Sequence, residues 1–210
     1  MKKNLLLVAV LLTSFIHAQT GVKPEILGRF NVLGLLHPSD QNFSVGVEIR
    51  FNQQWSAGTD AGYIFYSNYL WEAKRTSGFI VRPFIRHYLK ESRRSFVEAE
   101  LHYKMANYKL EDWVGREVVN GVPAYEELTK FTFRKQAFGL HVKFGRVNPL
   151  TKNKKLLIEY YLGMGIRWKW NKSMDGEYRL QEGIFSGYKT DPEFTGLAVP
   201  MGVRLLFKIK

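Results

Sequence analysis

Apolar and polar residues alternate with a period of two along most of the chain, a pattern typical of β-strands whose two faces meet different surroundings. Between Phe43 and Asn52 every odd-numbered residue is apolar, and every even-numbered residue is polar or glycine. The alternation recurs over residues 97–105, 156–170 and 197–209, and more weakly over 26–36, 55–66, 78–90 and 131–145. These eight segments predict an all-β protein with about eight antiparallel strands.

The alternation alone leaves open which face points inward, because a soluble barrel buries its apolar face whereas a membrane barrel turns it toward lipid. The longer apolar stripes favour the membrane arrangement, since strands of soluble proteins are typically about 5–6 residues long. The opposite face combines acids, bases and glycines, which suits a narrow interior filled by paired charges. Aromatic residues are expected at strand ends, as in interfacial girdles: Trp55, Tyr103, Trp168, Trp170 and Phe207.

Connections between the predicted strands alternate between longer and shorter ones. They are expected at His37 to Asn42, near Gln53, and at Ser67 to Thr76, Glu91 to Ser95, Lys109 to Thr129, Val147 to Lys155 and Asn171 to Phe194. Outer-membrane barrels have short periplasmic turns and longer external loops, so both chain ends are expected on the periplasmic side. The prediction is therefore an antiparallel, up-and-down transmembrane β-barrel. Pro83 and Pro200 lie within predicted strands and lack a backbone N–H, so each predicts a bulge or a strand end.

The first residues have the layout of a secretory signal peptide. Lys2 and Lys3 precede an apolar stretch over residues 5–12, and small and polar residues then lead to Ala18. The apolar stretch is too short to span a bilayer as a helix. We expect cleavage after Ala18, which gives a signal peptide at residues 1–18, an outer-membrane β-barrel domain at 19–210, and export to the outer membrane.

Composition adds a basic balance and the absence of cysteine. The formal net charge is +12, and removing Lys2 and Lys3 leaves +10. A basic exported protein is expected to meet anionic lipid headgroups, and no nucleic-acid-binding signature beyond charge is present. The shorter connections are basic, whereas the predicted Lys109 to Thr129 loop is comparatively acidic. Because the chain has no cysteine, its stability must come from elsewhere than disulfides, and a closed backbone ladder supplies it.

Charged side chains on the polar faces predict ion pairs inside the barrel, because unpaired buried ions are costly. The expected interior cluster consists of Glu48, Arg50, Asp60, Arg82, Arg86, Glu98, Glu100, His102, Lys104, Glu159, Arg167 and Arg204. His102 and His141 make a metal or proton site conceivable, but ion pairing is the simpler account of the polar face. No metal and no cofactor are predicted, and a narrow barrel filled in this way is plugged.

Histidines near hydroxyls and carboxylates require a test for catalysis, since some small outer-membrane barrels modify lipids. His37-Pro38-Ser39-Asp40 combines a base, a hydroxyl and an acid, but a catalytic triad is defined by geometry and this run is also ordinary turn chemistry. We expect no enzyme. The alternatives left open are a lipid-modifying outer-membrane enzyme and a soluble periplasmic barrel that binds an apolar ligand.

Several short segments resemble a family of small outer-membrane β-barrels of unknown function and, more loosely, the barrel of outer-membrane protein A. They are residues 31–36, Gly46 to Glu48, Pro83 to Tyr88, Phe96 to Ala99 and Gly163 to Gly165. The last strand is similar to the signal read by the barrel insertion machinery, with matches at Gly202, Leu205 and Phe207. It departs from that signal at Pro200 and in the residues after Phe207. The resemblance implies a Gram-negative outer-membrane protein whose partners are membrane lipids and the insertion machinery.

Overall fold

The computed structural model describes residues 24–70, 73–89, 94–117, 124–173 and 193–209, so the predicted signal peptide lies outside the described residues. The elements are β1 (Glu25–Asn31), the 3-10 helix η1 (Val32–Gly34), β2 (Asp40–Arg50), β3 (Trp55–Ser67), β4 (Arg75–Tyr88), β5 (Ser95–Arg116), β6 (Tyr125–Pro149), β7 (Leu156–Ser173), β8 (Glu193–Ala198) and β9 (Met201–Lys208). The all-β prediction is therefore confirmed.

No helix in the part of the chain that the structure describes is long and apolar enough to cross a membrane.

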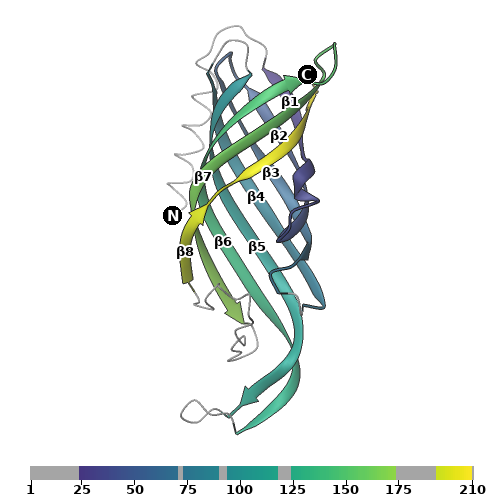
Figure 1. Cartoon of the computed structure of the whole chain (residues 1–210), viewed down its shortest axis with the longest axis vertical. Coiled ribbons are helices and arrows are strands. Elements are labelled where there is room, and N and C mark those ends of the chain that lie inside the picture. Colours follow the sequence, from purple (N-terminus) through teal and green to yellow (C-terminus); the bar gives the residue numbers. More distant parts are fainter. Residues whose placement is uncertain (1–23, 71–72, 90–93, 118–123, 174–192, 210) are drawn as a thin grey trace, which may run out of the picture.

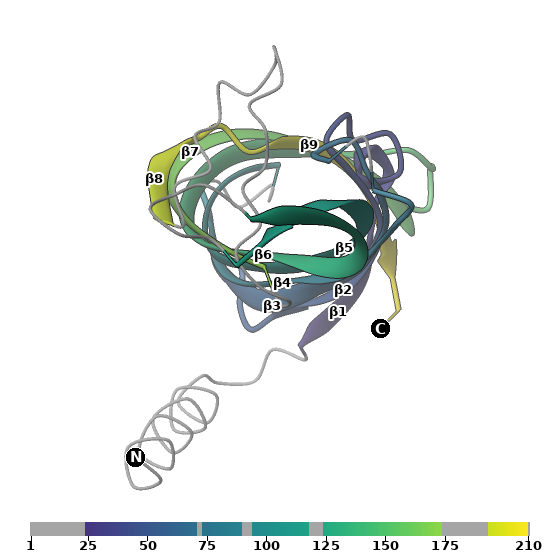
Figure 2. The same ribbon diagram turned by 90° about the horizontal axis from the view of Figure 1, so that it is seen from below.

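The strands form one antiparallel sheet that closes into a barrel-like ring, with each strand tilted across it (Figures 1 and 2). Strands β1 to β7 each pair with the next along the chain, and β9 pairs with both β1 and β7. Both edges of every strand from β1 to β7 thus have a neighbour. A closed ladder of this kind satisfies backbone donors and acceptors within the sheet.

Pro200 interrupts the closing strand, as the sequence predicts. Strands β8 and β9 both pair with β7, and the two ladders share one register, because Gly165 faces Ala198 and Leu162 faces Met201. The nine strands therefore occupy eight positions around the ring. The expectation at Pro83 is wrong, since this residue lies within β4 and faces Thr59 of β3. Pairing between β4 and β5 stops after Val81 and Tyr103 and resumes at Phe84 and Glu100 in the same register, so the missing N–H costs local pairing but creates no bulge.

The hairpin of β5 and β6 is longer than predicted and extends beyond the rest of the ring (Figure 1). Most of the predicted loop from Lys109 to Thr129 is paired strand, with Lys109 facing Thr132 and Arg116 facing Tyr125. The first strand is shorter than predicted, since β1 ends at Asn31 and η1 follows. Other connections match closely: Asn52 accepts hydrogen bonds from the N–H groups of Gln54 and Trp55 in the tight turn.

Connections 51–54 and 150–155 lie at one end of the ring, together with the start of β1, the end of β4, the start of β5 and the end of β9 (Figure 1). The Ile209 N–H donates to the Ile26 carbonyl there. The connection between β7 and β8, residues 174–192, lies outside the described residues. Of the aromatics expected at strand ends, Trp55 and Phe207 lie there, and Trp168 and Trp170 lie near the end of β7. Tyr103 does not, because β5 continues well beyond it.

The polarity of the ring is reversed relative to a soluble protein. Large apolar side chains on the outer face are exposed, among them Val47 on β2, Leu140 on β6 and Leu162 on β7. Charged side chains fill the middle of the interior, and two apolar clusters lie beyond them, one toward each end of the ring. One is Tyr88, Phe96, Val147, Tyr161 and Leu206. The other is Ile64, Ile80, Ala106, Tyr108, Leu110, Phe131 and Phe133.

Candidate functional site

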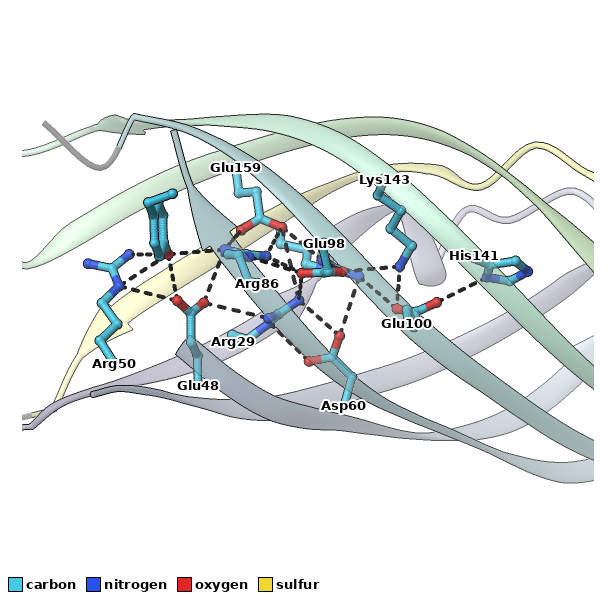
Figure 3. A network of polar contacts seen from close by, with 12 residues as sticks. Arg29, Glu48, Arg50, Asp60, Arg86, Glu98, Glu100, His141, Lys143 and Glu159 are labelled. Carbon is cyan, nitrogen blue, oxygen red and sulfur yellow. Dashed lines mark hydrogen bonds and ion pairs between the residues drawn. The ribbon is translucent and has the colours of Figure 1, made fainter. Parts of the chain in front are cut away.

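Ten charged side chains from eight strands meet inside the ring, and we call them the central network (Figure 3). It consists of five carboxylates and five cations: Glu48, Asp60, Glu98, Glu100, Glu159, Arg29, Arg50, Arg86, Lys143 and Arg204. None of the ten residues is more than 6% exposed. Each carboxylate contacts at least one of the cations, so the formal charges balance within the network.

Arg86 lies at the centre of this network and contacts three carboxylates. Its Nη1 is 3.1 Å from Glu48 Oε2 and 2.8 Å from Glu159 Oε2, and its Nη2 is 2.5 Å from Glu98 Oε2. Arg86 and Glu98 are direct cross-strand partners on β4 and β5, whereas Glu159 reaches them from β7. The guanidinium also stacks on the Phe96 ring at 3.7 Å. A planar fork of donors suits such multiple carboxylate contacts.

Arg204 and Arg29 join the remaining acids to this centre. Arg204 Nη1 is 2.8 Å from Glu159 Oε1, and its Nη2 is 3.4 Å from Asp60 Oδ2. Arg29 Nε is 3.1 Å from Asp60 Oδ1, and the Arg29 guanidinium covers the Phe84 ring at 3.8 Å. Both arginines also contact Glu98, and they share this acid with Arg86 on β4.

Tyr88 lies at the end of the central network that faces the turn at 51–54. Its hydroxyl donates to Glu48 Oε1 at 2.5 Å and accepts a hydrogen bond from Arg50 Nη2 at 2.8 Å. Arg50 also reaches Glu25 at the start of β1, with Nη1 3.0 Å from Oε2. The network thus runs from the strand ends to the middle of the ring.

Four of the predicted cluster residues lie outside the central network: Arg82, His102, Lys104 and Arg167. Lys104 forms an ion pair with Asp40 rather than with the five acids. Arg82 donates a 3.3 Å hydrogen bond to Ser44 and lies within electrostatic range of Glu100. Arg167 is only half-buried on β7. The expected direct pairing of Arg82 and Lys104 with these acids is therefore wrong, because both side chains lie nearer the opposite end of the ring.

Glu100, His102 and His141 form a second feature beside the network. One nitrogen or oxygen atom from each residue lies within 4.8 Å of the other two. His141 Nδ1 is 3.2 Å from Glu100 Oε1, and the two imidazole rings are 5.3 Å apart between centroids. Imidazole nitrogens and carboxylate oxygens are ligands that zinc and related metals accept. The chain therefore carries a donor set of the right type for a metal ion.

The His37 segment forms a turn and not a catalytic arrangement. His37 Nδ1 accepts hydrogen bonds from the N–H groups of Ser39 and Asp40, at 3.2 and 3.1 Å. The Asp40 carboxylate accepts a hydrogen bond from the Ser67 hydroxyl at 2.7 Å and pairs with Lys104. Base, hydroxyl and acid are thus engaged separately, which is the turn chemistry expected from the sequence.

The extended part of the β5–β6 hairpin is tied to the neighbouring connection. The Lys74 N–H donates to the Lys109 carbonyl at 3.0 Å, and the Lys74 ammonium pairs with the Glu111 carboxylate. The hydrogen bond from Lys74 lowers the pKa of Glu111. The base of the extension is therefore fixed to the ring.

Sequence reasoning missed Arg29, Lys143, Asp40 and Tyr88. Arg29 and Lys143 lie on the two weakly alternating segments 26–36 and 131–145. Arg29 shares its face with Leu27 and Asn31, and Lys143 shares its face with His141 and Gly145. Lys143 is two residues from His141, a spacing that could have identified it as inward-facing. Asp40 fell in a predicted connection, and Tyr88 was not separated from the outward-facing aromatics.

The predicted assembly signal lies in β9. Gly202 faces the interior, where an added Cβ would lie 2.5 Å from the Tyr161 hydroxyl oxygen, while Phe207 is exposed on the outer face. Leu205 shares the outer face with Phe207 through the alternation of the strand.

No protein-family model matches the sequence, and comparisons with curated proteins and with solved structures gave no significant match.

Proposed function

We propose that this protein is an integral β-barrel of the outer membrane of a Gram-negative bacterium, exported with residues 1–18 as a cleaved signal peptide, and that its role is structural or interactive. The observation that carries the proposal is the reversed polarity of the ring. The interior contains the central network, and the outer face presents exposed apolar side chains on β2 to β7.

Two physical costs support a lipid environment. A large apolar side chain left in water forgoes about 1.5–3 kcal/mol compared with burial, and the outer face carries many of them. A sheet exposed to lipid must also pair its backbone groups internally, which a closed sheet does. The ring has the polarity and the closure that such a surrounding requires. The partners of its outer face are then membrane lipids, and those of its assembly the barrel insertion machinery.

The interior favours a structural or interactive role over transport. The central network places five acids against five bases, and an apolar cluster lies beyond it toward each end of the ring. Buried ion pairs of this kind are held by several partners each, so they resist displacement. The surfaces left for recognition are the connections and the β5–β6 extension, where Trp113 and Leu128 face each other across the hairpin.

Neither alternative gains support. A soluble barrel that binds an apolar ligand needs an apolar interior, whereas charged side chains occupy the middle of this one. A lipid-modifying enzyme needs an activated group near the membrane surface, whereas His37 is engaged by backbone N–H groups in its turn.

The proposal is tested by expressing the full chain in a Gram-negative host, separating the membranes, and comparing gel mobility before and after boiling. We expect the protein in the outer-membrane fraction, with faster migration of the unboiled sample because a closed barrel stays folded in detergent. Recovery in the soluble periplasmic fraction would contradict the proposal, and so would a single band that boiling does not move.

A further inference from the structure

We propose that His102, together with His141 oriented by Glu100, forms a binding site for a divalent transition-metal ion such as Zn²⁺ inside the ring. Glu100 and His141 are direct cross-strand partners on β5 and β6, and His102 follows Glu100 on the same face of β5. The two imidazoles and the carboxylate therefore project from paired strands. Figure 3 shows His141 at the end of the chain of contacts that runs through Glu100 and Lys143.

The hydrogen bond to Glu100 decides which nitrogen of His141 is available. A carboxylate accepts, so the 3.2 Å contact places the proton of a neutral imidazole on Nδ1 and leaves a lone pair on Nε2. His141 is 1% exposed, and its Nε2 has no hydrogen-bond partner among the described residues. A carboxylate that fixes the tautomer of a ligating histidine is the usual arrangement behind a metal ligand. The buried lone pair on Nε2 can therefore coordinate a cation.

Gly139 and Gly165 lie on either side of the His141 imidazole and leave room for it. A Cβ at Gly139 would lie 3.0 Å from His141 Nε2, and one at Gly165 would overlap the edge of the imidazole. Gly139 is also the cross-strand partner of His102. The two glycines therefore let the imidazole fit between the strands, and no side chain at either position covers Nε2.

Neighbouring cations oppose a divalent charge and set the expected affinity. Lys143 pairs with Glu100, Arg204 Nη2 is 3.5 Å from Glu100 Oε2, and Arg82 and Arg167 lie within electrostatic range of His102. Glu100 and Glu98 offset part of this charge. We expect one site of moderate affinity, with two imidazole ligands and water completing the coordination of the metal. Removing Arg82 is then expected to strengthen metal binding, whereas an anion site would respond with the opposite sign.

The test measures zinc bound by the full-length protein, folded in detergent, by equilibrium dialysis and elemental analysis. Zinc is supplied both to the folded protein and during refolding, because the site is buried. We expect one zinc ion per chain for the native sequence. His141→Gln and His102→Gln should each weaken binding at least tenfold, and Arg82→Gln should tighten it several-fold.

His87→Gln is the matched control, since His87 lies on β4 against Trp55 with ring centroids 4.6 Å apart, and its zinc binding should not change. Heat-modifiable mobility verifies that each variant folds. No zinc on the folded native protein would overturn the proposal, as would unchanged binding in His141→Gln. Weaker zinc binding in Arg82→Gln would also overturn it.

Discussion

Arg86 illustrates how a single residue is stabilised inside this ring. Its guanidinium is fully buried and contacts Glu48, Glu98 and Glu159, which come from three different strands. Removing such a charge from water is expensive, and only several well-placed partners offset the cost. The stability of any one member of the central network therefore depends on all its neighbours.

The first prediction concerns Glu98, which contacts Arg29, Arg86, Lys143 and Arg204. Glu98→Gln leaves these cations short of one negative charge in a fully buried site. We expect a loss of about 3–5 kcal/mol of unfolding free energy, measured by urea titration of the folded protein in lipid vesicles. Glu126→Gln on the exposed hairpin is the control and should change stability by less than about 0.5 kcal/mol. Equal unfolding midpoints for the two variants would show that the network does not stabilise the fold.

The second prediction concerns Gly46, which faces Asp60 across β2 and β3. A Cβ there would overlap the Asp60 carboxylate and lie 2.6 Å from the Thr59 carbonyl oxygen. Gly46→Ala should therefore displace Asp60 from Arg29 and cost about 1–3 kcal/mol of unfolding free energy. Gly28→Ala is the matched control, because its Cβ would meet Ile209 at an ordinary 3.4 Å. A Gly46→Ala variant as stable as the Gly28→Ala variant would contradict the close-approach explanation.

At the scale of the elements, the sequence predicted strands well where the two faces meet different surroundings. The starts of β3 at Trp55 and of β7 at Leu156 agree with the alternation. The signal fails beyond the ring, because residues on both faces of β6 from Tyr125 to Glu127 are exposed and no period of two is required there. It also fails at residues 32–36, an apolar run whose single glycine did not mark the end of β1.

The third prediction tests the outer face through β7. Leu162 is 58% exposed near the middle of the strand, whereas Leu156 is the first residue of β7 and follows the 150–155 turn. If the outer face meets lipid, Leu162→Arg should cost about 2–4 kcal/mol of unfolding free energy in vesicles. Leu156→Arg should cost about 0–1 kcal/mol, because the guanidinium reaches water near the interface. Similar losses at both positions, or none at Leu162, would contradict a membrane around the ring.

At the scale of the whole molecule, ring closure decides which charges meet. Alternation along the sequence predicts the face of a residue, but not its height in a tilted sheet. Arg86 and Glu159 are far apart in the sequence and meet only because β4 and β7 face each other across the interior. Lys104 and Asp40 meet for the same reason on the other side of the central network. The sequence therefore predicted in large part which residues lie in the interior. Predicting which of their side chains form ion pairs would have required the register of every strand.

The last prediction concerns the orientation that the whole ring would have in the proposed outer membrane, and the absence of native cysteine makes this orientation accessible to single-cysteine labelling. Glu126 is exposed on the β5–β6 hairpin at one end, and Lys152 is exposed in the turn at the other. With external loops at the hairpin end, a membrane-impermeant maleimide added to intact cells should label Glu126→Cys and spare Lys152→Cys. Both variants should react equally after the cells are lysed, which shows that each thiol is reachable. Labelling of Lys152→Cys alone on intact cells would invert the topology, and equal labelling of both on intact cells would contradict a single orientation across the membrane.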